Sequence, residues 1–566
     1  MSVRVVSHLN GGKGMKSHYF LLTLLASFAF GMPEAQATLK KTCFTIKILR
    51  HPIKICLPIP EPPRCDKEPT GVKEEDYWLD VVTENMPDPN LDGQLVQMHV
   101  HRVKPVYANG KCPNVHNHAA VLVHGRSAPG TPSFDLRLAP TEEDPTGGRR
   151  SAQEALAWAG IDSFVPDLLG YGESWRGPLD DPCNASLPAC VVANADGSCP
   201  ANAPNPIEGT NDCSPVTVGC DRTRAAPVFP VNQQANRPVG LGVNPGLPLC
   251  AHSSPYHFAN PDVFASNILD VIDFAIDEAR PKSGKVVLLG YSFGGPSTAR
   301  TLYLLGDRAE RKVKRAVFMN SLFNVFPGAP GTPPLVTNLP TEEEDLSELE
   351  RSTSFPLALG GIGSWTGVGT PARDAQCTGR ITPDVITAFW DQIMALDPLG
   401  DTWGGTVPNV YDENGEVLVN NATGLLRSPT FTRNGWNPEV AATFTLPTLI
   451  MHAADDTVAL PANSNNMFEA LTSVTDKVLV QVECSSHQFI GEGCDLGRCD
   501  DQDPNTTPYG QDPDDPIWRG PSRTIAAALV EWIKDGSFNE SKCGHFIVNP
   551  SGIANEVATP NCPVEP

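Results

Sequence analysis

Short apolar runs alternate with helix-compatible segments along much of the chain. A strand-like alternation spans residues 94–103, and apolar runs follow at 119–123, 164–166, 286–289, 313–319, 448–451 and 478–482. Segments of helical character lie at 151–158, 263–279, 297–305 and 524–534. Short, continuously apolar strands are typical of a parallel sheet that is buried on both faces. The pattern therefore predicts an α/β fold with a mainly parallel central sheet and helices on both faces.

Two long stretches interrupt this pattern. Residues 175–255 are rich in Pro, Asn and Cys and lack periodicity, so we expect an insertion stapled by disulfides. Residues 325–440 contain the glycine-rich segment 360–367, and we interpret them as a cap with an aromatic surface. Their tryptophans are Trp365, Trp390, Trp403 and Trp436. Gly361 and Gly363 do not follow a predicted strand, which argues against a dinucleotide-binding loop.

The first residues are predicted to be a signal peptide. Lys16 precedes an apolar run at 19–31, and small residues at Ala35 and Ala37 match a signal-peptidase site. The apolar run is too short to span a bilayer comfortably, so we expect no stable membrane anchor. A buried N-terminal helix is the alternative. We expect cleavage after Ala37 and a secreted or periplasmic protein.

Cysteine content and charge narrow the possible partners. The chain has 16 cysteines, and an even number agrees with disulfides in an exported protein. No Cys-x-x-Cys pair is present, so we expect no zinc site, and we predict no other metal and no cofactor. A net charge of −23 and a pI of about 4.9 argue against nucleic acid or an anionic membrane surface as a partner. The acidic segment 495–515 is interpreted as solvated surface, and calcium at Asp500, Asp501 and Asp503 is left open because their spacing matches no known loop.

One apolar run leads directly into a Gly-x-Ser-x-Gly motif. The run at 286–289 is followed by the motif at 290–294, and a helix-compatible segment comes next. This order predicts a sharp turn that holds Ser292 exposed in an unfavourable backbone conformation. A side chain at Gly290 or Gly294 would clash in so tight a turn. Ser292 is therefore the predicted nucleophile.

A nucleophilic serine needs an acid that orients its base, and both should follow strands of the same sheet. Two aspartates follow the strand at 448–451. Asp456 is the better candidate and Asp455 is the second, while a turn or a helix N-cap is the alternative role for either residue.

The predicted base is His487, which lies directly beyond the last apolar run. His545 competes, but it lies past the final predicted helix among the terminal cysteines. The other histidines are more simply surface or strand residues than metal ligands. They include His99, His101, His116 and His118.

The tetrahedral intermediate of acyl transfer carries a negative charge that needs two N–H donors. The serine turn supplies the backbone N–H of Phe293. The second donor should come from the loop after an earlier strand, where His124 and Gly125 precede Arg126. We predict the N–H of Arg126 as this donor, and a plain glycine turn is the alternative.

Together these motifs resemble the α/β-hydrolase superfamily and occur in that family's order. They are His124-Gly125, the segment Asp167–Ser174, the serine turn, Asp456 and His487. The resemblance implies a Ser292–His487–Asp456 triad and a cap, at 325–440, that covers the substrate. The chain departs from the family at Ala453, where glycine is common, and in the Cys-rich insertion.

On this resemblance we divide the chain into four parts. They are the signal peptide (1–37), a Cys- and Pro-rich extension (38–75), an α/β-hydrolase domain (76–536) interrupted by both insertions, and a C-terminal tail (537–566).

The predicted function is that of a secreted serine hydrolase that cleaves a carboxylic ester through an acyl-enzyme. A serine at position 292 argues against dehalogenase or epoxide-hydrolase chemistry, for which an aspartate would be expected. Peptidase or amidase activity on the same scaffold is an alternative, because a triad does not choose the leaving group. The second alternative is a binding protein without catalysis.

Overall fold

The computed structural model describes residues 39–48, 51–60, 68–107, 118–126, 128–138, 149–180, 258–323, 354–357, 383–397, 405–406, 410–411, 417–419, 423–424, 426–429, 436–456, 458–492, 520–549, 552–557 and 562. The predicted signal peptide (1–37), nearly all of the Cys-rich insertion (175–255) and the acidic segment 495–515 lie outside the described residues.

The chain divides into two compact units, residues 1–64 and 65–566. The described residues of the first unit form an antiparallel hairpin of β1 (Leu39–Ile48) and β2 (His51–Pro60). Cys43 lies opposite Cys56 in its register. The sequence pattern did not predict these strands.

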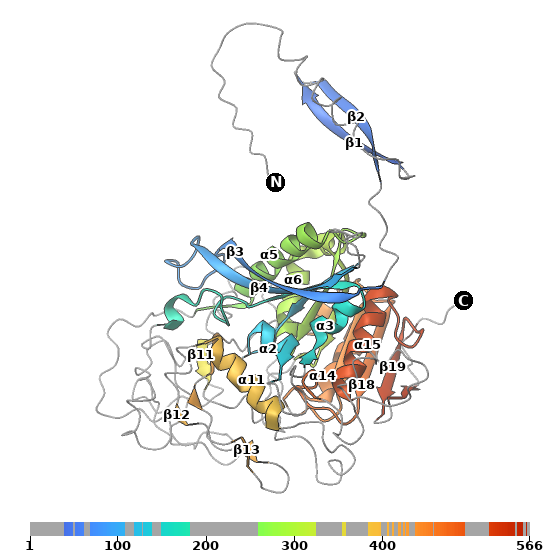
Figure 1. The fold of residues 1–566 in the computed structure, drawn as a ribbon. Coiled ribbons are helices and arrows are strands. Elements are labelled where there is room, and N and C mark those ends of the chain that lie inside the picture. The colour runs from blue at the N-terminus through green and yellow to red at the C-terminus, as the bar shows by residue number, and fades with distance from the viewer. Residues whose placement is uncertain are drawn as a thin grey trace. The chain divides into compact units, whose positions relative to one another are not determined.

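The second unit is built on a 10-stranded sheet with the order β20-β19-β18-β17-β10-β9-β5-β8-β4-β3 (Figure 1). Neighbouring strands from β19 to β8 run parallel, and β20, β4 and β3 join the edges antiparallel. The bounds are β3 (Gly71–Val82), β4 (Leu95–Val106), β5 (His118–Val123), β8 (Ile161–Pro166), β9 (Val286–Tyr291), β10 (Val313–Met319), β17 (Thr448–Ala453), β18 (Lys477–Val482), β19 (Gly544–Val548) and β20 (Ala554–Val557). The predicted mainly parallel sheet is confirmed.

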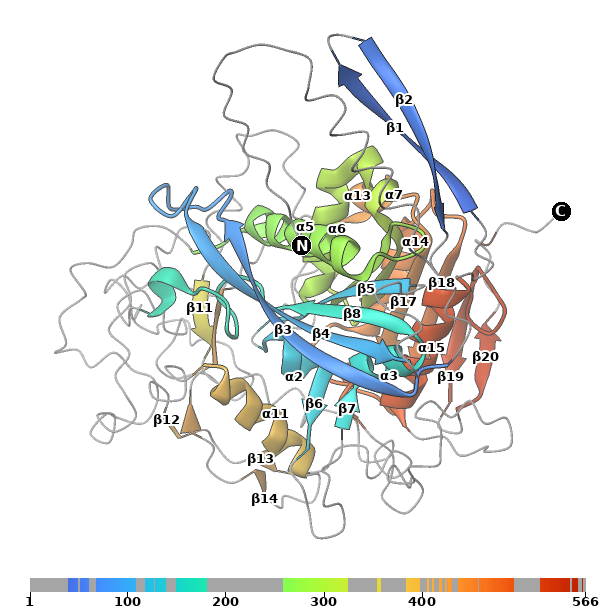
Figure 2. The same ribbon diagram turned by 45° about the horizontal axis from the view of Figure 1, so that its top comes forward.

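Helices cover both faces of this sheet, as predicted (Figure 2). Alternate strand residues face two separate hydrophobic clusters: Leu288 and Phe318 belong to one, and Leu289 and Met319 to the other. The first cluster packs against α5 (Pro261–Ala279), α6 (Gly294–Leu305), α13 (Pro438–Ala441) and α14 (Pro461–Ala470), and the second against α3 (Ala152–Trp158) and α15 (Pro521–Lys534). The other α-helices among the described residues are α2 (Gly130–Phe134), α7 (Ala309–Lys312) and α11 (Pro383–Ala395). None of the helices described is both long and apolar enough to cross a membrane.

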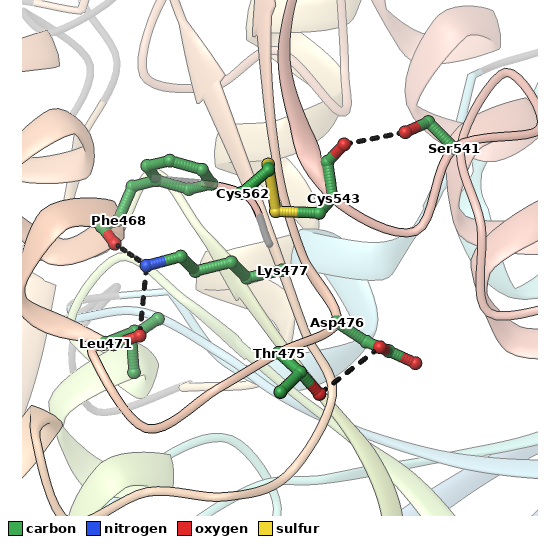
Figure 3. The surroundings of a disulfide bond; sticks show 8 residues. All are labelled: Phe468, Leu471, Thr475, Asp476, Lys477, Ser541, Cys543 and Cys562. Atoms are coloured by element: carbon green, nitrogen blue, oxygen red, sulfur yellow. Dashed lines mark hydrogen bonds between the residues drawn. A yellow bond between two sulfur atoms is a disulfide. The ribbon is translucent and has the colours of Figure 1, made fainter. Parts of the chain in front are cut away.

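The sheet extends past both predicted limits of the hydrolase domain. β3 begins at Gly71, before residue 76, and β19 and β20 lie within the predicted tail 537–566. A disulfide joins Cys543, next to β19, to Cys562 (Figure 3). The same view shows buried Lys477 donating to the carbonyl oxygens of Phe468 and Leu471, 3.0 Å each, where α14 ends. Lysine at a helix C-terminus satisfies carbonyls that have no partner inside the helix.

Parts of the predicted cap (325–440) pack on elements next to the 10-stranded sheet. β11 (Ser354–Leu357) pairs with β16 (Leu426–Pro429), and the Tyr171 hydroxyl donates to the Pro429 carbonyl at 2.8 Å. The short strands β12 (Gly405–Thr406), β13 (Val410–Tyr411), β14 (Val417–Val419) and β15 (Thr423–Gly424) form two further pairs. On α11, the Gln392 amide bonds to the backbone oxygen of Arg137 in β6 (Asp135–Arg137) at 2.6 Å.

The predicted aromatic surface of the cap is wrong for two tryptophans. Trp390 is 3% exposed and Trp436 is 1% exposed. Trp436 stacks on Phe318 of β10 and on Phe444, so it belongs to the core of the central unit. Trp365 and Trp403 lie outside the described residues.

His99 and His101 lie on β4, as the strand interpretation predicted, but both are buried in an ion-pair network rather than at the surface. Both face the same side of β4, where His99 bonds to Asp167 (3.0 Å) and to Asp76 (3.2 Å). His101 bonds to Asp76 at 2.7 Å and to Asp135 at 3.2 Å. Burial lowers the pKa of His101, but the bonds to Asp135 and Asp76 outweigh it and raise that pKa to about 9. The network thus joins the edge strands to β6 and to the loop after β8.

The raised pKa of His101 predicts a stability that falls as the pH rises. Between about pH 6.5 and 9 the folded state holds a proton that the unfolded state has released, so the free energy of unfolding should decrease through this window. We expect the free energy of unfolding to decrease on the order of 2 kcal/mol across this window. The decrease should be smaller in His101→Gln, which has no proton to lose at this position. Urea unfolding at several pH values measures it. His118→Gln is the control, because burial lowers the pKa of His118 to about 4 and places its titration below this window. Equal slopes for wild type and His101→Gln would contradict the assignment.

Candidate active site

Ser292 occupies the turn between β9 and α6. Its φ of 53° lies in the left-handed region, so the predicted unfavourable conformation is confirmed. The Ser292 N–H donates to Met319 O at 2.8 Å, which ties the turn to the neighbouring strand β10. A Cβ on Gly290 would lie 2.3 Å from the Gly294 carbonyl oxygen, as the predicted clash requires. A Cβ on Gly294 would instead lie 2.4 Å from Val123 O, so there the constraint comes from β5.

The side chains of Ser292, His487 and Asp456 form a continuous chain of hydrogen bonds. His487 Nε2 lies 2.7 Å from Ser292 Oγ, and His487 Nδ1 lies 2.7 Å from Asp456 Oδ2. An ionised carboxylate accepts hydrogen bonds, so it favours the tautomer with the proton on Nδ1. Nε2 is then free to accept the proton of the serine hydroxyl. All three residues are buried, and Ser292 keeps 7% of its accessible surface.

The two rival residues lie elsewhere. Asp455 is buried next to Asp456, and its backbone N–H donates to Ser485 O at 3.0 Å. His487 Nδ1 bonds to Asp456 Oδ2, the neighbouring carboxylate, at 2.7 Å. His545 lies on β19, where its Nε2 is 3.0 Å from Gln481 Oε1. The structure thus brings together the preferred acid and base, whereas their catalytic roles stay predictions.

Asp456 is oriented by its own backbone turn. Its Oδ1 accepts the N–H groups of Val458 and Ala459, both at 2.8 Å, while Oδ2 faces His487. Each carboxylate oxygen therefore has a separate task. Because both Oδ1 donors are backbone groups, the orientation of the carboxylate follows from the local fold.

The loop that carries His487 is held by a carboxylate that the sequence analysis missed. Fully buried Glu492 accepts the Ser486 N–H through both carboxylate oxygens, at 2.9 and 3.1 Å, and also bonds to the Ser486 hydroxyl. Cys484 begins this loop in a left-handed conformation (φ 54°) and is disulfide-bonded. A glutamate five residues after a histidine is too common a pattern to have indicated this role.

The turn that leads to Arg126, one of the predicted oxyanion donors, lies against the nucleophile. A Cβ on Gly125 would stand 2.9 Å from Ser292 Cβ, so the turn before Arg126 touches the serine. No backbone hydrogen bond of the Arg126 N–H occurs in the described part of the chain, and its role as an oxyanion donor stays a prediction. Phe293 precedes α6, and the first N–H groups of a helix point toward its N-terminal end.

His124 fixes the turn that precedes Arg126. Burial lowers the pKa of His124, so the ring is neutral near pH 7. In this state Nδ1 donates to Gly125 O at 2.7 Å and Nε2 accepts the Leu168 N–H at 3.1 Å. The ring thereby joins the Gly125 turn to the loop after β8.

Tyr291 holds the backbone of His487 in place. Its hydroxyl donates to His487 O at 2.7 Å, and its ring lies 5.4 Å from the imidazole, centroid to centroid. Burial, followed by the charges of Asp456 and Glu492, raises the Tyr291 pKa well above its ordinary value. Tyr291 therefore stays protonated and remains a donor.

Three side chains that could ligate a metal lie close together away from this site, at the β3–β4 edge. One potential ligand atom from each of Glu74, His101 and Asp135 lies within 4.8 Å of the others. Arg149 donates to both Asp135 oxygens at 2.7 Å and pairs with Glu74 at 2.7 Å. These carboxylates already have cationic partners, so we assign them to the ion-pair network.

Comparison with known proteins gives distant structural matches. No protein-family model matches the chain, and no curated protein matches its sequence. An esterase from Thermogutta terrifontis is 12% identical with a TM-score of 0.35, over 74% of this chain and 93% of that one. A bromoperoxidase from Bacillus anthracis is 14% identical with a TM-score of 0.33, over 71% and 92%. The naproxen esterase of Bacillus subtilis is 12% identical with a TM-score of 0.31, over 74% and 87%. Likenesses at this level assign no activity.

Proposed function

We propose that this chain, which has an α/β-hydrolase fold, is a serine hydrolase that cleaves carboxylic esters through an acyl-enzyme. The observation that carries the proposal is the pair of 2.7 Å hydrogen bonds from Ser292 through His487 to Asp456. The strained turn at Ser292 adds support, because it holds the hydroxyl at the carboxyl ends of the parallel strands, where catalytic groups of such sheets gather.

Each residue has a defined role in the proposed reaction. His487 Nε2 takes the proton of Ser292 as Oγ attacks the ester carbonyl, and the N–H groups of Phe293 and Arg126 stabilise the oxyanion. Collapse of the tetrahedral intermediate breaks the bond to the alcohol, which leaves with the proton from His487. Water, deprotonated by the same imidazole, then attacks the acyl-enzyme and releases the acid and Ser292.

Two other functions use the same structure. A serine peptidase or amidase would need the same triad with an amine as leaving group. A binding protein would use the fold without catalysis, which the short contacts of the three side chains disfavour.

A fluorophosphonate probe separates catalysis from binding. We expect wild type to be labelled and Ser292→Ala to be unlabelled, with kcat on p-nitrophenyl esters lowered by about 10⁴-fold or more. Ser133→Ala is a matched control, because Ser133 of α2 is equally buried, at 7%, and its hydroxyl donates to the carbonyl of Pro129, just before that helix. Cleavage of aminoacyl-anilides without ester cleavage would favour the peptidase. Absence of labelling in folded wild type would contradict the hydrolase.

Adjacent aspartates provide a test of the acid. Asp456→Asn should lower kcat by about 10⁴-fold, because an amide in place of the carboxylate no longer favours the Nδ1–H tautomer of His487. Asp455→Asn should lower kcat far less than Asp456→Asn, because the 2.7 Å bond to His487 Nδ1 comes from Asp456. Steady-state kinetics on one ester compares the two. The reverse pattern would assign the acid to Asp455.

We further propose that the protein is exported. The described cysteines Cys484, Cys543 and Cys562 are all disulfide-bonded, which agrees with an oxidising compartment. The mature protein should begin at Thr38, as N-terminal sequencing of the extracellular or periplasmic fraction would reveal. Recovery of an uncleaved chain from the cytoplasm would contradict export.

A further inference from the structure

Asn320 occupies the carboxyl end of β10, directly between the strand of the nucleophile and the strand of the acid. Its side chain is fully buried, and its φ of 44° lies in the left-handed region, which asparagine tolerates better than most residues. Its own N–H donates to Met451 O of β17 at 2.9 Å. The preceding residue, Met319, accepts the N–H of Ser292. The backbone at this point therefore touches both neighbouring segments of the site.

The Asn320 carboxamide extends these contacts to the loop of the base. Its Oδ1 accepts the N–H of Ala453, the last residue of β17, at 2.8 Å. Its Nδ2 donates to His487 O at 2.9 Å and to Ser486 O at 3.4 Å. One rigid, planar group thus spans the segment that leads to Asp456 and the loop that presents His487. The hydrogen bonds described for this carboxamide all go to backbone groups.

The His487 carbonyl is held from two directions. Asn320 Nδ2 and the Tyr291 hydroxyl both donate to it, at 2.9 and 2.7 Å, and a carbonyl oxygen has two lone pairs to receive them. Tyr291 links this carbonyl to β9, the strand that precedes Ser292. Asn320 links it to β17, the strand that precedes Asp456, through its own bond to the Ala453 N–H. The imidazole is therefore placed with respect to both of its partners through its own backbone.

We propose that Asn320 is a positioning residue whose carboxamide sets the distance between Asp456 and His487. The proposal rests on the proposed hydrolase function for its kinetic consequence, although the geometric effect itself does not require turnover. A displacement of about 1 Å in a catalytic group can cost roughly 10²-fold in rate. Loss of the two hydrogen bonds that hold the loop of His487 should therefore lower the rate measurably.

Asn320→Asp tests the donor role with little change of shape. Aspartate tolerates the left-handed backbone and retains an acceptor for the Ala453 N–H, but its carboxylate faces the carbonyl oxygens of His487 and Ser486 with no proton to donate. At about pH 8 we expect kcat to fall roughly 10- to 100-fold with KM changed less than about threefold. Burial favours the neutral carboxyl, whose O–H can donate to His487 O. The ratio of variant to wild-type kcat should therefore rise as the pH falls toward about 6.

The matched control is Asn267→Asp. Asn267 is also buried, at 2% exposure, and accepts a backbone N–H, that of Leu169, at 3.3 Å, but it lies on α5 away from the triad. Its kcat ratio to wild type should be independent of pH. An unchanged kcat in Asn320→Asp, or a loss of the same size at every pH, would overturn the positioning role.

A second readout does not depend on activity. The proton shared by His487 Nδ1 and Asp456 should give a downfield NMR resonance that disappears in His487→Gln. We expect this resonance to shift in Asn320→Asp and to stay in place in Asn267→Asp. A shift in a protein that cleaves no ester would support positioning and reject the proposed function. An unchanged resonance with unchanged kcat, in an active enzyme, would reject positioning and leave the function standing.

Discussion

The backbone turn at Ser292 is the constraint on which the rest of the site depends. α6 starts so close to β9 and to the end of β10 that a Cβ at Gly290 would lie 2.3 Å from the backbone of Gly294, and one at Gly295 would lie 2.0 Å from Ser321 Oγ. This packing leaves one path for the chain, and that path puts Ser292 in the left-handed region. The strained backbone conformation of Ser292 persists because the strands and the helix around it leave the turn no room to relax.

Parallel strands explain why residues far apart in sequence meet at this turn. Their carboxyl ends share one edge of the sheet, so the residues after β9, β10, β17 and β18 converge there. Ser292, Asn320, Asp456 and His487 each follow one of these four strands. The hydrogen bonds from Ser292 N to Met319 O and from Asn320 N to Met451 O then fix neighbouring segments relative to each other.

The same physics decides what the sequence could predict. Central strands are buried on both faces, so their sequences are continuous apolar runs. The predicted bounds of β10 are therefore the same as those of the strand in the structure. Edge strands lack this pattern: β3 carries the charged run Lys73, Glu74, Glu75 and Asp76, and its first residues were assigned to the Cys- and Pro-rich extension. β19 and β20 are likewise short and mixed in polarity. Nucleophile, acid and base candidates could be found because each directly follows a central strand.

Supporting residues could not be predicted because their roles come from contacts between distant elements. Asn320 follows a predicted strand, as Ser292 does, but an asparagine there is equally typical of an ordinary turn. Glu492 depends on a loop conformation, and Trp436 depends on the positions of Phe318 and Phe444. His99 and His101 show an alternation that fits a half-exposed strand, yet carboxylates from other elements surround both.

Burial of charge separates the histidines of this acidic protein into two groups. Where carboxylates bond directly to the ring, as at His101, their attraction outweighs burial and raises the pKa. Burial prevails at His452, whose Nε2 lies 3.8 Å from Asp456 Oδ2 but bonds to Ala459 O, and lowers its pKa to about 4. A neutral His452 brings no positive charge to Asp456. The carboxylate therefore stays available to orient His487, which bonds to it directly at 2.7 Å.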